Sequence, residues 1–150
     1  MIKMILGLLF TLLFSTSVLS ADSLVTIKSN LTVKVTADRF ENIIKQKGLT
    51  VFARINHAEN ASNVSLDLDP TEVIIFGNPK VGTPLMQCSK TVAIDLPQKA
   101  LFWQDEAGQA WLSYNNPEYL KERHGIKGCD HVISKISNVL SKLSKAATLK

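Results

Sequence analysis

The order of apolar and polar residues along the chain predicts strands interspersed with helices. Apolar and polar residues alternate over 23–28 and 31–35, and again over 49–56, as they do in half-buried strands. Residues 71–77 are apolar on both faces, which is typical of a strand inside a sheet that is covered on both sides. Aromatic residues alternate along both arms of 99–115 around a short polar turn, so this stretch predicts a hairpin.

Apolar residues at three- and four-residue spacing predict the helices. Thr36 is placed to cap a helix that carries Phe40 and Ile44 on its apolar face, and Gly48 is a natural stop for it. Further helices are expected over about 79–94, 117–124 and 131–146.

This mixture of elements predicts the α+β class, with a mixed or antiparallel sheet of about five strands and helices packed on it. The strand over 49–56 would turn Val51 and Ala53 to one face of that sheet, and Phe52 and Arg54 to the other. Residues 21–150 suit a single compact domain.

The first 20 residues are typical of a secretory signal peptide. Lys3 precedes an apolar core over 5–13, and small residues at Val18 and Ser20 predict cleavage after Ser20. An uncleaved membrane anchor is the alternative, but the apolar stretch is short for a full span, and no later segment is long and apolar enough. We therefore expect an exported protein, in the periplasm or outside the cell.

The charge balance is mildly basic. The formal net charge is +4, and it falls to +3 when Lys3 leaves with the signal peptide. Much of the excess lies at Lys135, Lys142, Lys145 and Lys150, where a solvated helix face is the usual meaning. The sequence has no arginine cluster with interleaved aromatic residues, so we expect no nucleic-acid partner, and no motif implies a cofactor.

Cys88 and Cys129 are the two cysteines of the chain, and in an exported protein the first expectation is a disulfide between them. Such a bond closes a loop of about 40 residues and contributes roughly 4 kcal/mol in the chain-entropy model. As free thiols, they would form with Met86 and His131 a soft-metal site suited to copper or zinc, although the spacing matches no zinc-finger pattern.

Residues 77–83 have the G-x-x-x-x-G spacing of a phosphate-binding loop. Thr83 stands where that motif needs lysine, and Pro79 and Pro84 remove two backbone N–H groups from a motif that works through such groups. The stretch therefore predicts a tight connection between a strand and a helix.

Three segments, "GLTVFARINHAENA", "PTEVIIFGNPKVGTPLMQ" and "AIDLPQKALFWQDEAGQAWLSYNNPEYLKERHGI", resemble the family known as domain of unknown function 302. The resemblance runs from about Leu24 to Ile126 with the segments in the family's order. It implies a small α+β domain that is often exported in bacteria, and no established reaction. Cys88, Cys129 and His131 lie outside the family's pattern.

The most plausible role is non-enzymatic binding of a small ligand or a protein partner. The residues expected to bind lie at or beside strand ends, where one rim could gather them. They are Arg54, His57, Asn78, Thr83, Met86, Trp103 and Tyr114.

Two alternatives come from other classes. An enzyme would use His57 or His124 as general base with Asp95, and it needs a histidine within hydrogen-bond reach of that carboxylate, in a cleft. A homodimer would bury the hairpin aromatics and would show an exposed apolar patch on the monomer.

Overall fold

The computed structural model describes residues 22–149, so the signal peptide expected over 1–20 lies outside the described residues. Within this range five strands form one sheet in the order β1-β5-β4-β3-β2, and every neighbouring pair is antiparallel. The strands are β1 (Leu24–Lys28), β2 (Thr50–Asn56), β3 (Thr71–Gly77), β4 (Gln98–Gln104) and β5 (Ala110–Asn115). The helices are α1 (Val33–Gln46), α2 (His57–Ser62), α3 (Pro79–Cys88), α4 (Pro117–Arg123) and α5 (Asp130–Thr148), with a 3₁₀ helix η1 (Lys90–Ile94).

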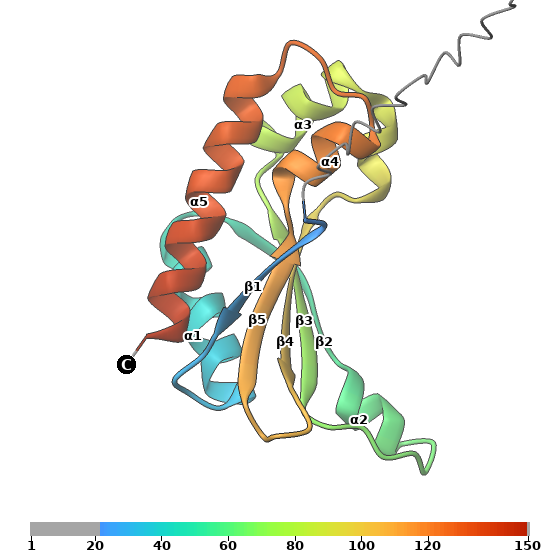
Figure 1. Cartoon of the computed structure of the whole chain (residues 1–150), viewed down its shortest axis with the longest axis vertical. Helices are drawn as coiled ribbons and strands as arrows, with labels where there is room; N and C mark the ends of the chain where they lie inside the picture. Colours follow the sequence, from blue (N-terminus) through green and yellow to red (C-terminus); the bar gives the residue numbers. More distant parts are fainter. Residues whose placement is uncertain (1–21, 150) are drawn as a thin grey trace, which may run out of the picture.

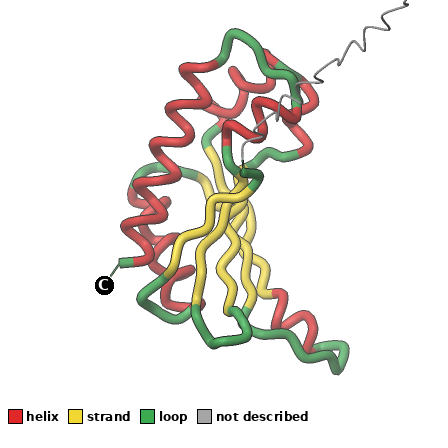
Figure 2. Tube along the Cα trace, in the orientation of Figure 1, coloured by secondary structure: helices red, strands yellow, loops and turns green. Residues whose placement is uncertain are grey.

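The long helices α1 and α5 lie side by side over one face of the sheet (Figures 1 and 2). Helices α3 and α4 lie beyond one end of the sheet, and α2 extends from the other end. The core fills the space between α1, α5 and the sheet. At its centre Phe40 packs edge-on against Phe76 and Phe102, with ring centroids 5.1 and 5.4 Å away. The α+β class is confirmed, and the sheet is antiparallel throughout.

The strand predicted over 31–35 is wrong, because this stretch begins α1. The hydroxyl of Thr32 accepts a hydrogen bond from the backbone N–H of Val35 and caps the helix. Val33 and Thr36 are buried at helical spacing, so the apparent alternation is one turn of an amphipathic helix.

Strand β2 carries a bulge that the alternation of its residues does not reveal. Val51 pairs with Phe76 but Ala53 pairs with Ile75, so Phe52 has no partner on β3. Because the extra residue reverses the alternation, Val51 and Ala53 lie on opposite faces, which corrects the prediction that they share one. Phe52 is 52% exposed and lies at the end of the sheet nearest α3.

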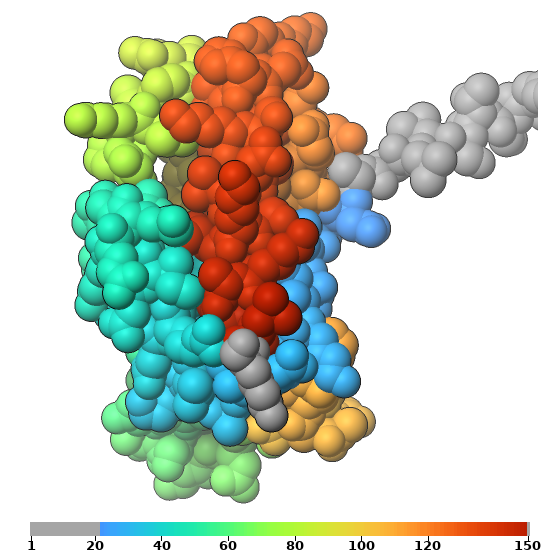
Figure 3. All heavy atoms as spheres, turned by 90° about the vertical axis from the view of Figure 1, so that its left-hand side faces the viewer, coloured from blue at the N-terminus to red at the C-terminus, as the bar shows by residue number. Residues whose placement is uncertain are grey.

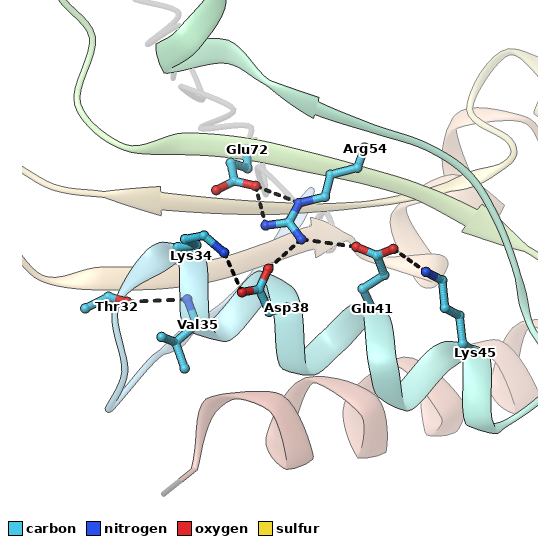
Figure 4. A network of polar contacts seen from close by, with 8 residues as sticks. All are labelled: Thr32, Lys34, Val35, Asp38, Glu41, Lys45, Arg54 and Glu72. Carbon is cyan, nitrogen blue, oxygen red and sulfur yellow. Dashed lines mark hydrogen bonds and ion pairs between the residues drawn. The ribbon is translucent and has the colours of Figure 1, made fainter.

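A charged network ties β2 and β3 to α1 (Figure 4). The guanidinium of Arg54 donates to Glu72 Oε2 at 2.7 Å, to Asp38 Oδ1 at 2.7 Å and to Glu41 Oε2 at 3.1 Å. Each of the two α1 carboxylates also pairs with a lysine four residues away on the helix. The guanidinium is thus occupied by three carboxylates, which is a structural arrangement and not an open binding group.

The network shifts the pKa values of its members. The hydrogen bond from Lys34, followed by that from Arg54, lowers the pKa of Asp38. The hydrogen bond from Lys45 is the largest cause of the lowered pKa of Glu41, with a further contribution from Arg54. Burial alone would lower the pKa of Arg54, but its hydrogen bonds to the carboxylates outweigh burial and raise it.

These directions predict acid sensitivity. Because the folded-state pKa values of Asp38 and Glu41 lie below their unfolded values near 4, the unfolded chain binds more protons as the pH falls below about 4. The stability from these pairs is complete at neutral pH and is lost with acid. Urea denaturation between neutral pH and about pH 3 should show a shallower acid slope for Asp38→Asn than for wild type. Asp67→Asn, at an exposed site, is the control, and an unchanged slope in Asp38→Asn would contradict the assignment.

Candidate functional site

A cavity of about 500 Å³ opens between α3, α5 and the end of the sheet where β2 begins and β3 ends. Figure 3 shows it as a hollow between the yellow-green α3, the teal end of α1 and the red α5. Its lining is mainly apolar. The apolar side chains are Leu49, Phe52, Phe76, Val81, Met86, Ala93, Leu96, Pro97, Ile136, Val139 and Leu140.

The cavity exists because α5 is longer than the helix beside it. Helix α1 ends at Gln46, and Gly48 turns the chain into β2 with a φ of 71°. Helix α5 continues past that point and reaches α3, to which it is joined by a disulfide. Ile136 and Leu140 of α5 therefore face the gap between the end of α1 and α3.

The glycine in α3 keeps this gap open. A Cβ at Gly82 would meet only Leu96 Cδ1 within 4 Å, at 3.9 Å, so a side chain there has room to extend into the cavity. Glycine inside a helix costs about 1 kcal/mol relative to alanine. Glycine at position 82 therefore makes α3 less stable, and it leaves the adjoining part of the cavity unfilled by a side chain.

Among residues 22–149, one buried polar side chain lines the cavity. Gln98 is 9% exposed and pairs with Phe76 across β3 and β4, which turns it to the face that α1 and α5 cover. Its Nε2 has no hydrogen-bond partner within residues 22–149. A buried amide donor without a protein partner can bond to an acceptor in the cavity, either a water or a ligand oxygen.

Within residues 22–149, the two charged side chains that line the cavity are both cationic. Lys47, after α1, and Lys135, on α5, both line it and are solvent-exposed. Neither makes an ion pair in the described part of the chain, and no aspartate or glutamate within 22–149 lines the cavity. The site is an apolar pocket with one inner hydrogen-bond donor and positive charge at its exposed side.

Cys88 and Cys129 form the disulfide that the sequence predicts, with their Cα atoms 6.4 Å apart. It joins the end of α3 to the start of α5, and so holds together two walls of the pocket. The soft-metal alternative needs both sulfurs as thiolates, and here they are bonded to each other. His131 lies exposed on α5, and residues 22–149 contain no group of three or more His, Cys, Asp or Glu side chains placed to hold a metal ion.

Asn78, Thr83 and Met86 are the predicted binding residues that the structure brings together at the pocket. Asn78 follows β3 directly, and its side chain accepts a hydrogen bond from the N–H of Lys80 to cap α3. Residues 77–83 form the tight connection from strand to helix that the sequence indicates. Whether these three residues contact a ligand stays a prediction.

Arg54, His57, Trp103 and Tyr114 do not join them, so the single rim expected from the sequence is not formed. In an antiparallel sheet, successive strands end at opposite edges. His57 follows the end of β2 and Trp103 lies near the end of β4, whereas the pocket lies where β3 ends. Arg54 is held in the charged network described above.

Trp103 and Tyr114 lie on opposite faces of the sheet. Trp103 stacks on Trp111 at a centroid distance of 6.2 Å and donates its indole N–H to Ser113 Oγ, on the face that α1 and α5 leave uncovered. A homodimer through these aromatics stays a prediction. Tyr114 is buried on the helix-covered face, and burial raises its pKa.

His124 and Asp95 form the close pair that the enzyme alternative needs, but they do not line the pocket. The distance from His124 Nε2 to Asp95 Oδ2 is 2.5 Å, and Nδ1 lies 3.1 Å from Thr91 Oγ1. The side chain of His124 is 6% exposed and has both ring nitrogens engaged. The pair ties η1 to the end of α4, and His57 is far from Asp95, at the other end of the sheet.

Several pocket residues escaped the sequence analysis. Phe52 faces the cavity because of a bulge that leaves no mark in the pattern of residues. In the sequence, Lys47 and Lys135 look like ordinary surface lysines. Gln98 stands just before the predicted hairpin, and nothing in the sequence marks it as buried. The apolar stripe of α5, which is longer than α1 can cover, was the one available sign of a gap.

The structure defines a small α+β domain with a mainly apolar cavity that is open to solvent on one side. The family model for the domain of unknown function DUF302 matches residues 25–143. This chain therefore belongs to the DUF302 family, as its resemblance to that family indicates.

No helix within 22–149 is long and apolar enough to cross a bilayer.

Two curated relatives are similar to part of this chain. A protein named Fluoride-specific ion channel FluC 1, from Brucella suis biovar 1 (strain 1330), is 45% identical over 103 residues, which is 69% of this chain and 41% of that protein. Its namesake from Brucella abortus biovar 1 (strain 9-941) is also 45% identical, with 38% of its length covered. The chain thus spans about two fifths of these relatives.

The crystal structure of an uncharacterized conserved DUF302 protein from Bacillus stearothermophilus has the same fold. It aligns with a TM-score of 0.76 at 20% identity, over 85% of this chain and 99% of that one. At this identity the likeness concerns the fold alone.

Replacing Gln98 by leucine should stabilise the protein when no ligand is added. The substitution removes an unpaired buried amide and adds apolar surface of similar size, so we expect the free energy of unfolding to rise by about 1 kcal/mol. Gln104→Leu, at the other end of β4, is the matched control and should change little. Urea denaturation measures both, and a clear destabilisation by Gln98→Leu would contradict the unpaired state of the amide.

Removing the disulfide should cost stability without unfolding the sheet. The double variant Cys88→Ala/Cys129→Ala is expected to lose about 2–4 kcal/mol of unfolding free energy, because its unfolded chain is no longer cross-linked. Reductant should destabilise the wild type similarly and leave the variant unchanged. Equal stability of the oxidised wild type and the variant would show that the bond adds nothing.

Proposed function

We propose that this protein is a non-enzymatic binding domain that holds a small, mostly apolar molecule in the pocket between α3 and α5. The observation that carries the proposal is the cavity itself. Its volume of about 500 Å³ falls in the range of small-molecule sites, and its lining is apolar with a few polar groups, as such sites usually are.

The composition of the lining favours binding over chemistry. None of the described residues that line the pocket is a histidine, cysteine, aspartate or glutamate. General acid–base or nucleophilic catalysis mostly uses such groups within hydrogen-bond reach of a substrate. The pair of His124 and Asp95 lies outside the lining, with both imidazole nitrogens engaged.

An oxidising compartment is part of the proposal. The disulfide between Cys88 and Cys129 and the apolar start of the chain both support export. The ion-channel name of the Brucella relatives does not bear on the pocket, because the likeness covers less than half of each of those proteins.

Filling the pocket should weaken binding and raise stability together. Gly82→Leu places a side chain toward Leu96 and the cavity and replaces a helical glycine, so we expect about 1 kcal/mol of added stability. Binding of an apolar fluorescent probe such as anilinonaphthalene sulfonate should weaken at least about tenfold, as an occupied pocket requires.

The matched control is Gln87→Leu, which adds the same side chain to α3 at an exposed position outside the lining. It should bind the probe as the wild type does. Undiminished probe binding in Gly82→Leu, with the variant folded by circular dichroism, would refute the pocket as the binding site.

A further inference from the structure

We propose that the ligand is an amphipathic acid. Its carboxylate lies at the mouth between Lys47 and Lys135, its apolar body fills the pocket, and a second, uncharged oxygen accepts a hydrogen bond from Gln98. The inference rests on the proposed function and adds the chemical class of the ligand.

The first argument is the sign of the charge at the mouth, which is the solvent-exposed side of the pocket beside Lys47 and Lys135. Lys47 directly follows α1, Lys135 lies in the N-terminal third of α5, and both line the pocket. Neither is neutralised by an ion pair among residues 22–149, whereas Lys34 and Lys45 of α1 are each paired with a carboxylate. An anion at this mouth meets two unpaired cations, and a cation meets only repulsion.

A second hollow, beside the pocket on α5, is also lined by basic and polar side chains. It is lined by Ser134, Asn138 and the basic side chains His131 and Lys142, and it shares Lys135 and Val139 with the pocket. No acidic side chain of the described chain lines this hollow either. The surface around the mouth along α5 is therefore polar and basic, which suits an anionic group that keeps part of its water.

Gln98 fixes which part of the ligand goes inside. A carboxylate buried beside this amide would lose its water and gain one neutral donor, which does not compensate the cost of desolvation. A hydroxyl or keto oxygen loses much less and satisfies the unpaired Nε2. The charged end therefore lies at the lysines, and a neutral oxygen lies at the inner end of the apolar body.

The first experiment is calorimetric titration of the mature protein with decanoate, decanol and decylamine, each below its aggregation concentration. The wild type should bind decanoate about tenfold more tightly than decylamine, a difference that two exposed ion pairs can supply. In Lys47→Glu/Lys135→Glu this order should reverse. Lys90→Glu/Lys145→Glu makes the same change in net charge at exposed sites outside the pocket and should keep the wild-type order.

The second experiment tests the inner oxygen. Hydroxydecanoate with its hydroxyl at the chain end away from the carboxylate should bind more tightly than decanoate, by about fivefold for one satisfied hydrogen bond. Gln98→Leu should bind decanoate at least as well as the wild type and lose the preference for the hydroxy acid. A preference that survives in Gln98→Leu overturns the role of this amide.

The outcomes separate the two proposals. Equal affinity for the acid, the alcohol and the amine, with all three lost in Gly82→Leu, overturns the acid and leaves the apolar pocket as the binding site. Absence of binding by all three chains and by the fluorescent probe overturns the proposed function itself. Circular dichroism and thermal melts of each variant confirm that a loss of binding is not a loss of fold.

Discussion

The apolar stripe of α5 has to be covered along its whole length, and the rest of the architecture depends on how this is done. Toward its C-terminus the stripe packs against α1 and the sheet, where Phe40 and Phe102 complete the core. Toward its N-terminus α1 has ended, and α3 covers the helix from across a gap, joined to it by the disulfide. The first arrangement gives a close-packed core, and the second gives a cavity.

Charged side chains have two different roles, one along α1 and one just after its C-terminal end. Arg54 gathers Asp38, Glu41 and Glu72 into a network that binds the helix to β2 and β3 and engages all three carboxylates. Lys47, which follows the end of α1, makes no ion pair within the described chain and lines the pocket. Arginine suits the first role because its planar fork serves several carboxylates at once.

Periodicity and turn chemistry were enough to predict the fold class, the hairpin and the C-terminal helix. They failed where two patterns coincide over a few residues, as at 31–35, where one helical turn looks like a short strand. They also failed at Phe52, because a bulge depends on pairing with β3 and not on the residue itself. The pocket was recognised only in part, through Asn78, Thr83 and Met86, because its shape depends on where α1 ends relative to α5.

The position of Gly48 links the architecture of the sheet to the presence of a cavity. One more turn of helix before this glycine would extend α1 by about 5.4 Å into the space that now separates it from α3. The five strands and their pairing would not have to change. Cavity size can therefore vary among domains of this architecture through the length of a single helix, while the strands and their pairing stay the same.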